Sequence, residues 1–65
     1  MEVLLNGDPY SIDQNSTIEN LIARLQLDGK FAIEINQHII PRSEFPNTTL
    51  SSGDKIEIVE AIGGG

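Results

Sequence analysis

The residues of this chain with the clearest chemical potential are its last three, Gly63, Gly64 and Gly65. Glycine has more backbone freedom than any other residue, so three in succession predict a tail without a fixed conformation. Five extended residues, 61–65, reach about 16 Å at roughly 3.3 Å each. Without Cβ atoms, such a tail can thread a narrow channel in another protein and carry the carboxylate of Gly65 into its active site.

A terminal carboxylate must be activated before it can react, because it is a poor electrophile. ATP can activate it by forming an acyl-adenylate, and a sulfur nucleophile that displaces AMP would leave a thiocarboxylate at Gly65. The sequence contains no cysteine, so any sulfur chemistry has to use a group other than a thiol. The alternative interpretation is an inert, disordered tail or a linker remnant, and the composition of the tail alone leaves both open.

The length and charge of the chain limit its function. Its 65 residues correspond to one small domain. A domain of this size buries only about 60% of the surface that its unfolded chain exposes, which argues against a deep pocket and a self-contained enzyme. Ten acidic and four basic residues give a formal net charge of −6. This charge repels phosphates and favours a basic protein surface over nucleic acid as a partner, although solubility alone also accounts for it.

Few other residues predict chemistry. His38 is the only histidine, and we interpret it as a surface residue because no Ser, Asp or Cys pattern surrounds it. Histidines and carboxylates do not recur with the spacing of metal ligands, so neither a metal nor a cofactor is expected. We find no secretory signal and no apolar run near the roughly 18 residues of a membrane span. The expected location is the cytoplasm, without membrane contact.

The elements that would position the tail are several strands and one helix. Apolar or alternating segments between turn residues predict strands over residues 2–6, 9–12, 31–36, 38–40 and 55–62. Asn6-Gly7 is the strongest kind of short hairpin signal, and residues 51–54 predict a second turn. Residues 42–45 predict a helical turn whose length Pro46 limits.

The predicted helix is amphipathic. Ser16, with Glu19 three residues later, matches a capping box, and Gly29 suits a left-handed exit. Apolar residues at helical spacing form one face: Ile18, Leu21, Ile22 and Leu25. A sheet with a single such helix buries the helix against one of its faces. We expect the helix to meet these sheet residues: Val3, Leu5, Phe31 or Ile33, Ile56 and Ile58.

This order of elements is typical of the β-grasp, or ubiquitin-like, fold, an α+β architecture with a mixed sheet and one main helix packed on one face. The fold type implies that the first and last strands pair in parallel at the centre. We expect residues 1–60 to form the domain and residues 61–65 to form a flexible C-terminal tail.

An apolar patch on the outer face of the sheet is a hypothetical docking site for partner proteins. Its expected apolar residues are Leu4, Tyr10, Ile39 and Val59, with Glu57 and Glu60 as an acidic rim. Ile62, at the base of the tail, is a further candidate contact. Burial of the patch by the chain's own loops is the alternative. Arg42 is interpreted either as a partner contact or, preferably, as a structural residue paired with Glu44.

Over its whole length the chain resembles the sulfur carriers of thiamine thiazole biosynthesis, the ThiS type. The most specific segment is residues 35–42, Ile-Asn-Gln-His-Ile-Ile-Pro-Arg. The other matching segments are Asn6-Gly7 and residues 31–36, 53–58 and 61–65.

The resemblance implies a carrier on which other enzymes act, not an enzyme. A partner activating enzyme related to ubiquitin E1 would adenylate Gly65 with ATP. A sulfur donor protein would then supply the sulfur of the thiocarboxylate, and thiazole synthase would receive it. Gly64 would be the other member of the terminal Gly-Gly pair, and Gly63 occupies a position where many members have alanine.

Three other functions fit the same tail. A molybdopterin-synthase small subunit shares the fold and the thiocarboxylate, although such proteins are usually longer. A ubiquitin-like modifier would join Gly65 to a lysine through an isopeptide bond, after the same adenylate. A non-covalent interaction module would have an inert tail, and deleting Gly65 would leave its function intact.

Overall fold

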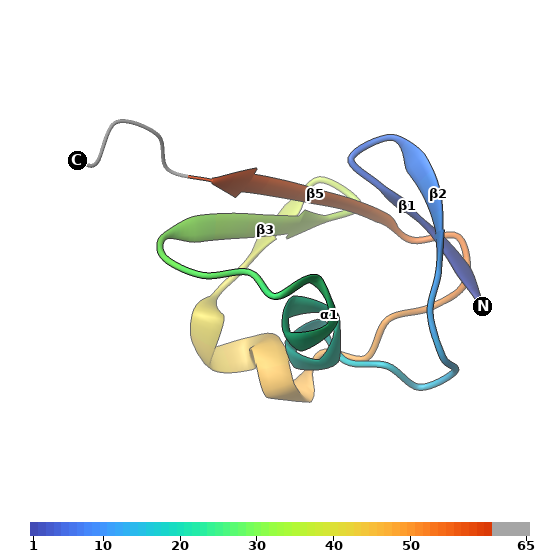
Figure 1. The fold of residues 1–65 in the computed structure, drawn as a ribbon, viewed down its shortest axis with the longest axis horizontal. Coiled ribbons are helices and arrows are strands. Elements are labelled where there is room, and N and C mark those ends of the chain that lie inside the picture. The colour runs from blue at the N-terminus through green and yellow to red at the C-terminus, as the bar shows by residue number, and fades with distance from the viewer. Residues whose placement is uncertain (61–65) are drawn as a thin grey trace.

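A five-stranded mixed sheet forms one layer of the molecule, and two helices cover one of its faces (Figure 1). The computed structural model describes residues 1–60, so the predicted tail lies outside the described residues. The strands are β1 (Glu2–Leu5), β2 (Asp8–Ser11), β3 (Phe31–Ile35), β4 (His38–Ile40) and β5 (Lys55–Glu60). The helices are α1 (Ile18–Leu25) and the 3-10 helix η1 (Arg42–Asn47).

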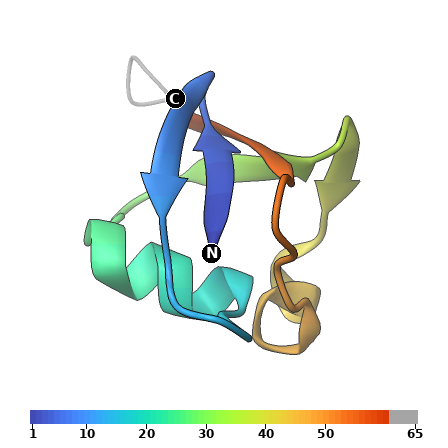
Figure 2. The ribbon, with the colours of Figure 1, turned by 90° about the vertical axis from the view of Figure 1, so that its right-hand side faces the viewer.

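The strand order β2-β1-β5-β3-β4 places the last strand at the centre of the sheet. β5 pairs in parallel with β1, whereas the β1–β2, β3–β5 and β3–β4 pairs are antiparallel. Figure 2 shows α1 and η1 side by side on the same side of this sheet. The arrangement confirms the predicted β-grasp architecture and its central parallel pairing.

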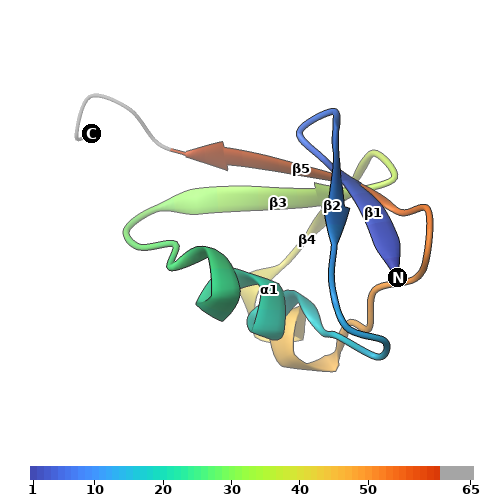
Figure 3. The ribbon, with the colours of Figure 1, turned by 45° about the vertical axis from the view of Figure 1, so that its right-hand side comes forward.

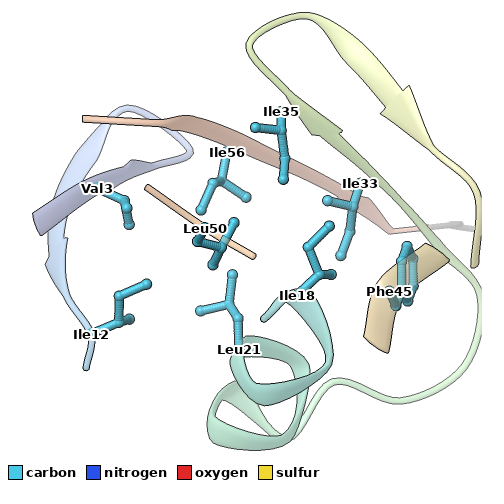
Figure 4. Packing of buried hydrophobic residues seen from close by; sticks show 9 residues of the cluster. All are labelled: Val3, Ile12, Ile18, Leu21, Ile33, Ile35, Phe45, Leu50 and Ile56. Carbon is cyan, nitrogen blue, oxygen red and sulfur yellow. The ribbon is translucent and has the colours of Figure 1, made fainter. Parts of the chain in front are cut away.

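The hydrophobic core lies between the sheet and the two helices. Its buried members come from every layer: Val3, Ile12, Ile18, Leu21, Ile33, Ile35, Phe45, Leu50 and Ile56. Figure 4 shows Ile18 and Leu21 of α1 extending toward the sheet residues Ile33 and Ile56. The predicted helix stripe is confirmed, although its other two members, Ile22 and Leu25, are only partly buried.

The start of α1 corrects the predicted capping box by one residue. Thr17 is the N-cap: its Oγ1 accepts from the backbone N–H of Asn20 at 3.1 Å, and the Oδ1 of Asn20 accepts from the N–H of Thr17 at 2.9 Å. Ser16 instead donates its hydroxyl to the carbonyl of Asp13. A backbone hydrogen bond from Leu50 to the carbonyl of Ser16 holds this segment extended, so the helix starts later.

Replacing Thr17 with alanine is expected to lower the free energy of unfolding by about 1 kcal/mol, because it removes the oxygen that satisfies a free helical N–H. Ser16→Ala should cost clearly less, since Ser16 does not cap the helix. Urea unfolding followed by circular dichroism measures both variants. Equal losses, or a larger loss for Ser16→Ala, would contradict this assignment of the cap.

Two helix ends also differ from the sequence prediction. The C-cap of α1 is Gln26, which adopts the left-handed conformation at φ 56°, while Gly29 has its own positive φ of 79° in the following loop. η1 continues through Pro46 to Asn47 and does not stop before the proline. The φ of proline, near −65°, matches the 3-10 conformation, so Pro46 removes a single N–H donor without forcing the chain out of the helix.

Candidate functional site

The described chain ends on β5, the strand from which the predicted tail would leave the domain. β3 pairs with β5 along its whole length, up to the register pair Phe31–Glu60. β1 pairs only with the first part of β5, through Leu4–Lys55 and Leu5–Ile56. Beyond that point the side chain of Asn6 replaces the missing strand, because its Oδ1 accepts from the backbone N–H of Ile58 at 2.8 Å.

A second set of side-chain hydrogen bonds holds the beginning of β5. The Oδ1 of Asn36 accepts from the backbone N–H of Lys55 at 3.0 Å, and its Nδ2 donates to Asp54 at 3.1 Å. The other carboxylate oxygen of Asp54 accepts from the N–H of Ser51 at 2.8 Å. Asn36 and Asp54 belong to two of the segments that carry the sequence resemblance, residues 35–42 and 53–58. Their role here is structural, because they connect the β3–β4 turn to the start of β5.

β5 is consequently fixed at both ends and in its middle, and in Figures 1 and 3 its far end lies on the opposite side of the molecule from the N-terminus. The predicted reactive Gly65, its neighbours Gly63 and Gly64, and the candidate contact Ile62 lie outside the described residues.

Within residues 1–60, both helices lie on one side of the sheet, so its outer face has no helix over it. Register places Leu4, Glu57 and Val59 on this face, because they alternate with the core residues Val3, Ile56 and Ile58. Val59 of β5 is 57% exposed and Ile39 of β4 is 71% exposed, so loops within residues 1–60 do not bury these two members of the predicted patch.

Two predicted members of the patch lie elsewhere. Tyr10 is opposite the buried Val3 and packs against the core, with the Arg24 guanidinium 5.6 Å from its ring centroid. Glu60 pairs with Phe31, which also packs against the core, so it belongs to the helix-covered face and not to the rim around Val59. Period-2 alternation predicts two faces for each strand but not which face of β2 points inward.

Sequence reasoning missed one feature of the outer face, the pairing of Glu34 with Glu57. These residues are direct register partners on the antiparallel strands β3 and β5, and Ile39 is the partner of Glu34 on its other side. None of the side-chain hydrogen bonds found within residues 1–60 involves either carboxylate. Glu34 alternates with the core residues Ile33 and Ile35, a signal that could have placed it outward but not opposite Glu57.

Replacing Glu34 with glutamine is expected to raise the free energy of unfolding by about 0.2–1 kcal/mol, because like charges directly opposite each other destabilise a strand pair. The gain should shrink in high salt, which screens exposed charges. Urea unfolding at two salt concentrations tests this. A variant that is less stable than the wild type at low salt would contradict it.

Two surface hollows lie on the helix side of the molecule. One, of about 440 Å³, lies between residues 12–16 and the start of α1; the other, of about 310 Å³, lies between the end of α1 and η1. Beside the second hollow, the Arg42 guanidinium lies 5.1 Å from the ring centroid of Phe31 and 5.9 Å from that of Phe45. These contacts support the structural interpretation of Arg42, through aromatic rings instead of the predicted pairing with Glu44.

Neither hollow gathers groups that suggest catalysis. His38 is exposed on the edge strand β4. Within residues 1–60, histidines and carboxylates do not form a group of three that could hold a metal ion. The described helices are also too short or too polar to span a bilayer.

Comparison with known proteins identifies the family. The family model described as "ThiS family" matches residues 3–65. A Bacillus subtilis sulfur carrier protein ThiS is 42% identical over 63 residues, which cover 94% of this chain and 96% of that protein. The crystal structure of a thiamine biosynthesis protein (ThiS) from Geobacter metallireducens superposes with a TM-score of 0.85 at 28% identity, over all of both chains.

A longer relative contains a segment similar to this chain. A thiazole synthase from Paramagnetospirillum magneticum is 38% identical over 66 residues, and the match covers all of this chain but only 20% of that protein. The chain thus spans about a fifth of the length of this relative. The family model, the near full-length relatives and the shared fold agree: the chain belongs to the ThiS family.

Proposed function

We propose that this protein is a sulfur carrier of thiamine biosynthesis whose reactive group is the carboxylate of Gly65. An E1-like activating enzyme joins this carboxylate to the AMP moiety of ATP and releases pyrophosphate. A hydrosulfide equivalent from a sulfur donor protein then attacks the acyl carbon and displaces AMP, which leaves a thiocarboxylate. The thiocarboxylate gives its sulfur to thiazole synthase, and the carrier itself performs none of the catalysis.

The observation that carries this proposal is the family match, which runs through residue 65 and includes the terminal glycines. The fold is consistent with it. β5 is held by β3 up to Glu60 and by the Asn6 side chain at Ile58, so the base of the tail is well defined. Beyond it, five residues that reach about 16 Å are long enough to place Gly65 in a partner's active site while the domain stays outside.

Thiazole synthase is proposed as the partner that receives the sulfur, because a protein of that name is among the relatives of this chain. The thiazole synthase of Paramagnetospirillum magneticum includes a segment similar to this whole chain. Two functions joined in one polypeptide are held at a high effective concentration, which benefits partners that react with each other. We infer that this carrier meets a thiazole synthase in the same way, as a separate or a joined domain.

The outer sheet face is proposed as the surface that docks these partners. Exposed apolar residues that cluster on a small domain mark interaction sites more often than isolated ones do. The contacts proposed on this face are Leu4, Val59 and Glu57. Glu60 and Ile62 are proposed as contacts near the base of the tail, where the partner's channel would begin.

Mass spectrometry of the C-terminal peptide tests the proposal directly. The protein is incubated with ATP, a sulfur donor and the candidate activating enzyme, and fragment ions locate any change. The C-terminal peptide is measured, and not only the intact protein, because oxidation of Met1 adds nearly the same mass to the intact protein as replacing oxygen with sulfur. The untreated peptide also establishes that the chain ends at Gly65 with a free carboxylate.

An ATP-dependent replacement of oxygen by sulfur at Gly65 is the expected result. A Gly65 that becomes linked to a lysine would instead identify a ubiquitin-like modifier. An unchanged Gly65 alongside an enzyme preparation that activates a known carrier would overturn the sulfur-carrier proposal and leave a non-covalent interaction module.

A further inference from the structure

We propose that the Glu34–Glu57 pair binds an arginine side chain that projects from an otherwise apolar surface of the thiazole synthase. This inference rests on the proposed function, because it names the chemistry of a partner surface for the docking face. It begins from the two carboxylates, whose arrangement the fold alone does not explain.

The geometry places the two carboxylates side by side. Glu34 and Glu57 are register partners, and directly opposed residues in an antiparallel pair have Cβ atoms about 5 Å apart. Each lies on the outer face, since the adjacent pairs Ile33–Ile58 and Ile35–Ile56 belong to the core side. Two like charges at this separation repel each other in the free protein, so the pair is a local cost to the fold.

The cation nearest along β5 forms no side-chain hydrogen bond with either carboxylate within residues 1–60. Lys55 shares the outer face but is the register partner of Leu4, and it lies two residues from Glu57 along the strand. None of the side-chain hydrogen bonds within residues 1–60 reaches Glu34 or Glu57, so their oxygens are available to a partner's donors.

Apolar side chains flank the carboxylates. Ile39 is the register partner of Glu34 on β4 and is 71% exposed. Val59, two residues beyond Glu57 on the same face of β5, is 57% exposed. A partner that covers both apolar groups removes water from the carboxylates between them. Buried without a cation, two carboxylates would be strongly unfavourable, so the partner surface has to supply positive charge at this point.

Arginine fits the pair better than lysine does. Its planar guanidinium presents five N–H donors in a fixed fork, so one group can donate to carboxylates on two neighbouring strands. Its weaker hydration also makes arginine the cation most suited to a partly apolar interface. The net charge of −6 adds a long-range attraction toward a basic partner.

Thiazole synthase is the partner to which we assign this surface because a protein of that name contains a segment similar to this whole chain. A carrier segment covalently joined to the synthase still has to dock in the correct orientation. A charged anchor within an apolar patch provides orientation more than it provides affinity. The carboxylate pair would therefore set the direction in which β5 and its tail approach the synthase.

The test compares binding of three variants to purified thiazole synthase from the same organism, by isothermal titration calorimetry at low and high salt. Glu34→Gln and Glu57→Gln each keep the size of the side chain and remove one charge. Glu44→Gln removes one charge from η1, on the opposite side of the sheet, and is the matched control. Urea unfolding of each variant shows that the protein is folded.

Each of the two face variants is expected to bind about tenfold more weakly than the wild type, whereas Glu44→Gln changes binding less than about twofold. A fourth variant that combines Glu34→Gln with Glu57→Gln should also show a weaker salt dependence of binding than the wild type. At the same time, Glu34→Gln should unfold at a higher urea concentration than the wild type. A substitution that strengthens the fold and weakens binding is the signature of a charge pair kept for a partner.

Wild-type affinity in Glu34→Gln and Glu57→Gln would overturn the inference, even if the thiocarboxylate forms at Gly65 and the carrier function stands. The inference would also be overturned if Glu44→Gln weakened binding as much as the two face variants do, because net charge alone would then explain the effect. Failure of the wild-type carrier to bind the synthase would reject the assigned partner. The mass measurement at Gly65 tests the carrier function independently of all three.

Discussion

Removal of Gly65 is expected to reduce the rate of ATP-dependent thiocarboxylate formation by about 100-fold or more. The shortened chain still ends in a glycine carboxylate, now on Gly64, so the chemistry of the terminal group is unchanged. The position of the terminal carboxylate does change, because the tail is shorter by one residue, or about 3.3 Å. A displacement of only 1 Å at a reacting centre can cost about 100-fold in rate. Quantitative mass spectrometry of the C-terminal peptide measures the effect.

The matched control for this deletion is Gly63→Ala. This variant keeps the length of the tail. Alanine adds one methyl group at a position where many proteins of the ThiS type have alanine. This variant should form thiocarboxylate at nearly the wild-type rate. Both variants should unfold at the wild-type urea concentration, because neither changes the hydrophobic core found within residues 1–60. A deletion variant that reacts as fast as the wild type would show that tail length does not position the reactive group.

Replacing Ile33 with alanine is expected to remove most of the stability of the domain. Ile33 is 0% exposed and lies on β3 between β4 and β5, facing Ile18 of α1 (Figure 4). Truncating a fully buried isoleucine to alanine costs about 2–5 kcal/mol, because it loses burial and leaves a cavity. A domain of this length has a free energy of unfolding of roughly 3–10 kcal/mol. The variant should therefore be partly unfolded in water, or nearly so.

Circular dichroism during urea unfolding measures this loss, with Ile33→Val as the control. Valine removes a single methylene, so its expected cost is about 0.5–1.5 kcal/mol and its fold should persist. If Ile33→Ala costs less than the valine variant, the position must be able to collapse around the missing atoms. The core would then be less closely packed at the centre of the sheet than its burial implies.

The local elements of this protein follow from short segments of sequence. The apolar spacing of Ile18 and Leu21 determines the buried side of α1, and alternation over residues 31–35 determines the buried side of β3. Asn6 and Gly7 both have positive φ at the first hairpin turn, as their types predict. These signals are readable because each depends on residues only a few positions apart.

The edges of the elements depended on distant contacts. Ser16 and Thr17 are both good caps, and the backbone hydrogen bonds of Leu50 to Ser16 and of Ile18 to Thr48 select the second of them. Likewise, the sequence does not reveal that Asn6 continues the sheet by bonding Ile58, 52 residues away. Propensity ranks such residues, but long-range pairing chooses among them.

By itself, then, the sequence determined the class of fold, the helix stripe and the chemical character of the Gly63–Gly65 tail, because composition and periodicity are local properties. Only the tertiary structure decided that Glu34 lies opposite Glu57, that Ile39 and Val59 stay exposed beside them, and that Tyr10 turns toward the core. The physical reason is register. A period of two residues assigns alternate side chains to two faces, but which residues meet across strands depends on how segments far apart in the chain close together.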